Sequence, residues 1–179
     1  GFEIYHDKAK DTVMAILMLA MMVPFVAVLV PLFQMFTKAK LINSWAGFIM
    51  PSIATPFLIM YFRNSARSFP RDTLEAARID GLNEFQIFIR MFIPMMKPTY
   101  ASAATITFMN AWNAYLWPKV IMQTNEAITM PMLVANTMGG YVIDYGVVMA
   151  AVTICSLPTV IIFFCLQKSF TNAVAGAVK

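Results

Sequence analysis

The sequence predicts an all-α integral membrane protein with a single transmembrane domain over residues 1–179. Hydrophobic residues make up 60% of the chain and charged residues 12%, with a mean hydropathy of +0.69. A soluble domain carries roughly 25% charged residues, so this chain has about half the charge that a water-facing surface needs. Uncharged runs of 20 to 26 residues recur along the chain. About 20 such residues cross a hydrocarbon core of about 30 Å, so we expect about four membrane spans.

The first two spans are expected at residues 12–37 and 41–62. Each contains two prolines, whose missing N–H groups leave backbone carbonyls that neighbouring helices or polar side chains must satisfy in lipid. We therefore expect both helices to be kinked and packed within protein. The prolines are Pro24, Pro31, Pro51 and Pro56.

The third and fourth spans are expected at residues 99–118 and 145–167, with a kink at Pro158 in the fourth. Residues 119–144 are too polar and too broken by proline and glycine to span, and they predict an external loop with a short surface helix. Residues 168–179 are small and predict a cytoplasmic tail of flexible composition.

Residues 63–98 form a charged loop between the second and third spans. They hold ten of the 22 charged residues of the chain. Four spans place residues 1–11, 63–98 and 168–179 on one side, with ten of the 13 Lys and Arg residues. This excess identifies the cytoplasmic side, so the loop is expected to be cytoplasmic and the protein to be a multi-pass plasma-membrane protein.

The loop predicts two short helices separated by a turn. Pro70 suits the first turn of one helix, and Asp80-Gly81 suits a turn with positive φ. In the second helix, from about Asn83 to Phe92, four apolar residues fall at i, i+3, i+4 and i+7, and Pro94 is expected to end it. These residues are Phe85, Phe88, Ile89 and Phe92. Such a stripe fits either an interfacial helix on lipid or a helix that inserts into a groove on a soluble partner.

The loop resembles a motif of a known family. Glu75-Ala76-Ala77, three residues, Gly81, nine residues and then Met91-Phe92-Ile93-Pro94 is similar to the EAA loop of binding-protein-dependent ABC importer permeases, which favours the docking alternative. The family prefers Ile where Met91 stands and Leu where Ile93 stands, and both changes conserve volume and polarity. Further segments resemble the carbohydrate-uptake branch, in particular the second permease of the maltose type. They are Trp112-Asn113, Leu116-Trp117-Pro118, Thr129 with Pro131, Asp144-Tyr145-Gly146, Leu157-Pro158 and Ala175 to Lys179.

The resemblance implies a permease subunit that imports a sugar or oligosaccharide across a bacterial plasma membrane. A dimer of separate ATPase subunits would dock on the loop, a second permease subunit would complete the pore, and an extracytoplasmic sugar-binding protein would deliver the sugar to the external loop. The resemblance also implies six spans, so the sequence is expected to continue before Gly1. The coupling residues that it implies are Glu75, Ala76, Ala77, Asp80, Gly81 and Pro94.

The chain itself is not expected to be an enzyme. None of its seven glycines is followed by Lys, so the phosphate-binding pattern G-x-x-x-x-G-K-[ST] is absent from the sequence. A single histidine, His6, leaves no Ser-His-Asp arrangement among the spans. Cys155 and Cys165 suggest neither a disulfide nor a metal pair. We expect no catalytic residue, no metal site and no cofactor, and the scattered basic residues do not favour nucleic-acid binding.

A substrate path is expected along the third span. Asn110, Asn113 and Trp117 fall at i, i+3 and i+7, so a continuous helix would place them on one face. Amide groups can bond sugar hydroxyls, and an indole can pack on a sugar ring. The alternative is that the asparagines bond across helices and that Trp117 anchors the helix at the membrane surface.

Two other classes of function remain to be distinguished. An ion-gradient-driven secondary transporter would need charged residues within its spans as a relay, and the four predicted spans carry none. A membrane scaffold that recruits a soluble partner would also carry a charged loop. Loss of an ATPase partner on substitution in the loop would separate the importer from both.

Overall fold

The computed structural model describes residues 8–140 and 143–176, and no β-strand occurs among them. The chain is a series of helices, which confirms the all-α prediction. In chain order these are α1 (Lys8–Met21), α2 (Phe25–Lys38), α3 (Trp45–Ile49), the 3-10 turn η1 (Met50–Ser52), α4 (Pro56–Arg67), α5 (Arg71–Ile79), α6 (Glu84–Ile87), the π-helical segment η2 (Phe88–Phe92), α7 (Ile93–Met95), α8 (Lys97–Trp112), α9 (Leu116–Ile121), the 3-10 turn η3 (Asn125–Ala127), α10 (Met130–Thr137) and α11 (Tyr145–Gly176).

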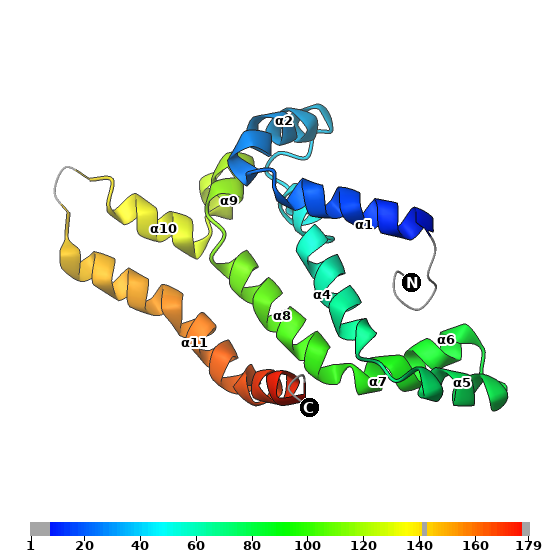
Figure 1. The fold of residues 1–179 in the computed structure, drawn as a ribbon. Helices are drawn as coiled ribbons and strands as arrows, with labels where there is room; N and C mark the ends of the chain where they lie inside the picture. Colours follow the sequence, from blue (N-terminus) through cyan, green and yellow to red (C-terminus); the bar gives the residue numbers. More distant parts are fainter. Residues whose placement is uncertain (1–7, 141–142, 177–179) are drawn as a thin grey trace.

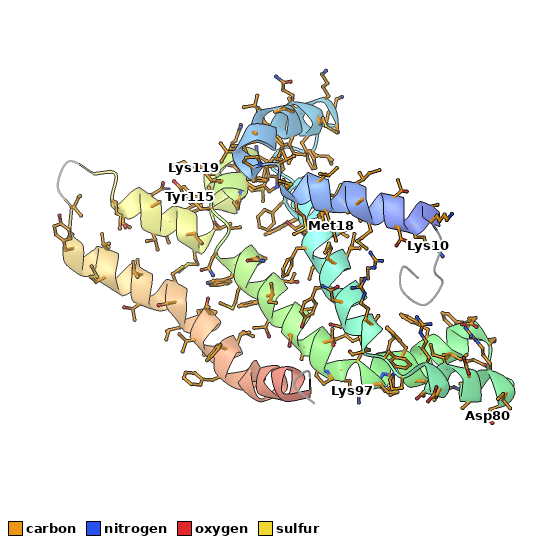
Figure 2. All side chains as sticks on the ribbon, viewed as in Figure 1. Lys10, Met18, Asp80, Lys97, Tyr115 and Lys119 are labelled. Atoms are coloured by element: carbon orange, nitrogen blue, oxygen red, sulfur yellow. The ribbon has the colours of Figure 1, made fainter. Side chains whose placement is uncertain are left out.

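Three helices, α4, α8 and α11, run side by side and give the molecule its long direction (Figure 1). α8 lies in the middle and packs against both of the others, and α1 packs on α4. The short helices α5, α6 and α7 gather at one end of this layer, while α2 and α9 lie at the other end (Figure 1). Lys97 and Lys119 mark the two ends (Figure 2).

The first predicted span is not a single helix. α1 and α2 meet at 102° across a break of a few residues at Pro24. Pro24 has an extended backbone (φ −61°, ψ 134°), and its ring disfavours helical geometry in the residue before it, so the chain turns there instead of kinking gently. α1 has 14 residues and a length of about 21 Å, which is shorter than the hydrocarbon core.

The second predicted span is bent, as its prolines suggest. The helical stretch Trp45–Ser52 and α4 meet at 43°. Ser44 caps α3 by accepting a hydrogen bond from the Gly47 N–H at 3.0 Å, and Thr55 caps α4 by accepting one from Leu58 N–H at 3.4 Å. Pro56 occupies the first turn of α4, where its missing N–H costs nothing.

The third and fourth predicted spans differ in how they end. α8 stops at Trp112 after 16 residues, and the chain becomes helical again only at Leu116, so the expected helix over 99–118 is wrong in its last third. α11 includes an apolar stretch, Tyr145–Cys165, with the length and composition of a membrane span, and the helix accommodates Pro158 internally. It continues to Gly176, so residues 168–176 of the expected tail are helical.

Counted by length and composition, the described residues contain one spanning helix, or up to three if each bent pair is one span. α8, with 16 residues and a length of about 24 Å, is shorter than the hydrocarbon core and is not in this count, so the number four stays a prediction. Only 6% of the apolar window of α11 is buried, which fits a surface covered by lipid or by other helices.

Two buried clusters lie at opposite ends of α8. The loop cluster consists of Phe69, Leu74, Ala77, Ile87 and Met96. The distal cluster consists of Trp117, Ile121 and Met122, with Leu29, Leu32, Phe36, Ile42 and Phe48 packed against it. α8 is also tied to α11, because the Trp112 indole Nε1–H donates to the Cys155 carbonyl at 2.8 Å.

Candidate functional site

The turn between α5 and α6 is built as the sequence predicts. Gly81 has φ +78°, a conformation that a side chain would strain. Its N–H donates to the Arg78 carbonyl at 3.0 Å, and Leu82 N–H donates to the Ala77 carbonyl at 3.1 Å. This pair of bonds is a Schellman motif, which closes the C-terminus of α5 and fixes the direction of the chain. Asp80 lies at the outer tip of the loop and points away from α4 and α8 (Figure 2).

A capping box starts the second helix of the loop. Asn83 Oδ1 accepts a hydrogen bond from the Gln86 N–H at 2.9 Å, and Gln86 Oε1 accepts one from the Asn83 N–H at 3.0 Å. The Arg78 Nε–H donates to Glu84 Oε1 at 2.8 Å and links α5 to α6. Because both side chains are about half exposed, this ion pair contributes less than about 1 kcal/mol to stability. The turn is thus defined mainly by backbone bonds.

α5 has two distinct faces. Leu74 and Ala77 are buried in the loop cluster, with 6% and 1% of their surface exposed. Glu75, Ala76 and Ile79 lie on the outside, and Ile79 is 86% exposed. An apolar side chain so exposed, beside a small residue and two carboxylates at Glu75 and Asp80, is suited to contact another protein. We name Glu75, Ala76, Ile79 and Asp80 the outer face of α5.

The position of Ala77 differs from the expectation that it lies in the docking seat. Its side chain packs inside the loop, so a partner cannot touch it without opening the loop cluster. The helical period explains the difference, since Ala77 follows Leu74 by three residues and shares its buried face. Ile79 was not predicted as part of the site. It follows Glu75 by four residues and Ala76 by three, and this spacing indicates that it shares their helix face.

Three of the four residues in the apolar stripe of the second helix face outward. Ile87, which is not in the stripe, is 2% exposed and fills the loop cluster, whereas Phe85, Phe88 and Ile89 are 71%, 46% and 45% exposed. The helix changes to π-helical geometry at Phe88, and this shifts the register of the following residues away from the α-helical period. Phe92, the last residue of the stripe, packs against the loop cluster, with its ring centroid 5.1 Å from that of Phe69. The stripe is therefore divided between an outward part and one residue that faces the loop interior.

Pro94 does not end the second helix. α7 follows η2 without a gap, and Pro94 lies exposed in its first turn. A wider π-helical turn precedes it, which accommodates a residue that has no N–H to donate. A single turn residue, Met96, separates α7 from α8 and is buried in the loop cluster.

The three expected path residues do not share a helix face. Asn110 lies exposed on α8 and lines a hollow of about 120 Å³ together with Ser52, Thr55 and Thr107. Asn113 is the C-cap residue of α8, and its Nδ2 donates to the Met109 carbonyl at 2.9 Å. The two amides are three residues apart but have different surroundings. Asn110 lies beside a hollow, and Asn113 caps the C-terminus of α8.

Trp117 belongs to a separate helix and to the interior. It lies in α9 and is only 7% exposed, its Nε1–H donates to the Gly47 carbonyl at 3.2 Å, and its ring meets Phe36 edge-on at 5.3 Å. Neither a sugar-stacking position nor a membrane-surface anchor fits this burial. The break of α8 at Asn113 is the physical reason, because the expected face required an unbroken helix.

No group of three or more His, Cys, Asp or Glu side chains among residues 8–140 and 143–176 is arranged to hold a metal ion. Cys155 and Cys165 are both free thiols, the first partly buried and the second exposed. The candidate site of the loop therefore consists of the outer face of α5 and the turn at Gly81.

Comparison with known proteins gives a consistent result. Residues 4–176 match the family model described as "Binding-protein-dependent transport system inner membrane component". The whole chain is 39% identical to the "Lactose transport system permease protein LacG" of Rhizobium radiobacter and 33% identical to the "Arabinooligosaccharides transport system permease protein AraQ" of Bacillus subtilis. It spans 66% and 64% of the lengths of these two relatives.

A solved structure has the same fold. It is described as a bacterial ABC transporter involved in the import of the acidic polysaccharide alginate, and one of its chains aligns with a TM-score of 0.78 at 23% identity. The alignment covers 92% of the present chain and 63% of that chain.

Proposed function

Because this chain belongs to the inner membrane component family of binding-protein-dependent transport systems, we propose that it acts as a permease subunit that imports a sugar or oligosaccharide. The family resides in the plasma membrane and consists of transport components, so ATP hydrolysis is assigned to a separate subunit. Relatives named for lactose, arabinooligosaccharides and melibiose/raffinose/stachyose support a carbohydrate substrate and do not favour an ion-gradient-driven transporter or a scaffold.

The observation that carries the proposal is the outer face of α5. A nine-residue helix held by a Schellman turn presents Ile79 and Ala76 between Glu75 and Asp80. Small and apolar side chains permit close approach of a partner surface, and the carboxylates offer charged acceptors for basic groups. We assign this face, with Gly81 as its fixed turn, to the contact with the ATPase subunit. Ala77 and Pro94 are then assigned indirect roles. Ala77 packs in the loop cluster beneath α5, and Pro94 lies in the first turn of α7, where the loop leads back to α8.

The packing of the loop explains how such a contact could move the membrane helices. The loop cluster includes Phe69 just after α4 and Met96 just before α8, and Tyr100 of α8 packs against it. Tyr100 also meets Phe62 of α4, with ring centroids 5.0 Å apart. A displacement of α5 is thereby passed to both helices together, and from α8 to α11 through Trp112 and Cys155. Closure of two ATPase subunits would drive this displacement.

The sugar path is proposed to include Asn110, with Asn113 at its edge. Asn110 is an exposed amide beside a hollow whose other polar groups, Ser52, Thr55 and Thr107, are hydroxyls. Such groups can exchange hydrogen bonds with sugar hydroxyls in place of water. A second permease subunit would face this side of α8, and a sugar-binding protein would meet the region 119–144, which includes α10.

The experiment uses the full-length protein expressed with its ATPase and permease partners. Ile79→Arg places a charge in the proposed contact and is expected to abolish co-purification of the ATPase and uptake of a labelled sugar panel. The matched control is Met95→Arg, which puts the same charge on an exposed apolar residue of α7 in the same loop, outside both the outer face and the stripe. ATPase binding that survives Ile79→Arg, or is lost equally in both variants, would contradict the assignment.

A further inference from the structure

A second feature of the loop adjoins the outer face of α5 and shares Glu75 with it. Between the end of α4 and α5 there is a hollow of about 160 Å³, whose charged lining residues are Arg67, Arg71, Arg78 and Glu75. Arg71, Glu75 and Arg78 lie at i, i+4 and i+7 of α5, so they share one face of that helix. Arg67 reaches the hollow from the last turn of α4.

Three arginines thus line one small cavity. Among the described residues, Glu75 is the one carboxylate that lines it, and Glu84 accepts the 2.8 Å hydrogen bond from Arg78 Nε–H. This bond fixes the direction of the Arg78 guanidinium. Guanidinium groups are planar forks that bind the paired oxygens of phosphate with good geometry, and they stay charged at any physiological pH.

From this arrangement we propose that the hollow between α4 and α5 is a binding site for a phosphate monoester or diester. The source of the phosphate is either the headgroup of an anionic phospholipid or phosphate dissolved in the surrounding water. A headgroup is within reach because α4 is an apolar helix that carries Arg63 and Arg67 only in its last two turns, as helices do where they leave a membrane. Anionic lipids concentrate at the cytoplasmic surface.

Phosphate bound here bridges two elements. Arg67 belongs to α4 whereas Arg71 and Arg78 belong to α5, so a single anion would hold the angle between them. Ile79 and Asp80 do not line the hollow, and occupation of the site leaves that end of the outer face accessible. Glu75 belongs to both sites, so the phosphate site is tested at Arg71 and the docking face at Ile79, and either proposal can fail without the other.

The test is a titration of the full-length protein, purified in a neutral detergent, followed by native mass spectrometry. The probes are phosphatidylglycerol, phosphatidylcholine and inorganic phosphate. Arg71→Gln removes one guanidinium from the hollow, and Arg90→Gln removes an exposed one from η2 of the same loop as a matched control. Arg71 is exposed, so its replacement is not expected to unfold the loop.

We expect wild-type protein to bind phosphatidylglycerol at least about tenfold more tightly than phosphatidylcholine, and Arg71→Gln to weaken this binding about tenfold, as loss of one charge-assisted hydrogen bond predicts. Arg90→Gln should change it less than about twofold. Displacement of the lipid by millimolar inorganic phosphate assigns the site to dissolved phosphate, and resistance assigns it to the headgroup. Equal loss in the two variants, or no binding of phosphatidylglycerol and inorganic phosphate, would overturn the proposal.

Discussion

The two buried clusters differ in how far along the chain they reach. The loop cluster and the residues packed against it all lie between Phe69 and Tyr100, a single stretch that leaves α4 and enters α8. The distal cluster joins residues from Leu29 to Phe48 with residues from Trp117 to Ala127. One is local and belongs to a single loop, and the other connects two distant segments.

This difference suggests two mechanical roles. A cluster built within one loop keeps its shape while the loop moves, which suits a part that is pushed by a partner. A cluster that joins α2, α3 and α9 fixes those elements to one another, which suits a clamp at the opposite end of α8. The loop should therefore keep its structure when the distal cluster is disrupted by substitution, and the distal cluster should keep its structure when the loop cluster is disrupted.

The largest effect is expected from Trp117→Ala. It removes a buried indole, its bond to the Gly47 carbonyl and its contact with Phe36, and should lower the free energy of unfolding by about 3–5 kcal/mol. Thermal unfolding of the full-length protein in detergent measures this, and ATPase co-purification at low temperature should persist. Trp45→Ala is the control, because Trp45 is 71% exposed. Equal destabilisation by both variants would contradict the role of the distal cluster as a clamp, because an exposed tryptophan would then contribute as much as the buried one.

Ile87→Ala should act on the loop alone. It empties a site that is 2% exposed in the loop cluster and should cost about 2–4 kcal/mol, because the cavity is lined by rigid neighbours. Limited proteolysis should then cleave within residues 63–98 while the rest of the chain stays protected. Ile89→Ala, at an exposed position of the same loop, should leave the cleavage rate unchanged. Cleavage spread over the whole chain would show that the loop is not an independent unit.

Gly81→Ala tests the turn between the two loop helices. Gly81 has φ +78° with nothing within 4 Å of an added Cβ, so the cost comes only from backbone strain and should be about 1–2 kcal/mol. Hydrogen exchange of the α5 amides should become faster. Gly139→Ala is the control, since an added Cβ there meets only an ordinary contact at 3.5 Å. No change in exchange would mean that the Schellman turn does not stabilise α5.

The smallest effect is expected from Asn83→Ala. It removes one half of the capping box, and should cost about 1 kcal/mol in the stability of the second loop helix. Asn83→Asp keeps an acceptor for the Gln86 N–H and should restore most of that loss. Hydrogen exchange at Gln86 and Ile87 reports on it, and identical exchange in both variants would exclude a capping role.

Local features of the loop were predictable from the sequence. A positive φ at Gly81 and a second helix that begins next to Asn83, its N-cap, each depend on a few neighbouring residues, and the structure has both. Pro70, which was expected in the first turn of α5, is instead its N-cap, one residue before the helix. The motif that carries the family resemblance, from Glu75 to Pro94, lies in the same loop as these local features.

Features that depend on distant contacts were not predictable. The burial of Trp117 requires Gly47 and Phe36, which lie 70 and 81 residues away in the chain, so spacing within its own segment gave the wrong face. The 102° turn at Pro24 exceeds what a proline alone dictates, and packing of α2 on α9 accompanies it. The π-helical register of η2 and the inward position of Ala77 likewise depend on how the loop closes on its own core.

The most direct test of the proposed coupling role is cysteine cross-linking along α5. In a background that lacks the free thiols Cys155 and Cys165, single cysteines are placed on the outer face (Ala76→Cys, Ile79→Cys) and on the buried face (Leu74→Cys, Ala77→Cys) of the full-length protein in its assembled complex. A short thiol-to-amine reagent then reports contact with the ATPase subunit. The account predicts cross-links from positions 76 and 79 and none from 74 and 77. Cross-links from 74 and 77 with none from 76 and 79 would contradict it.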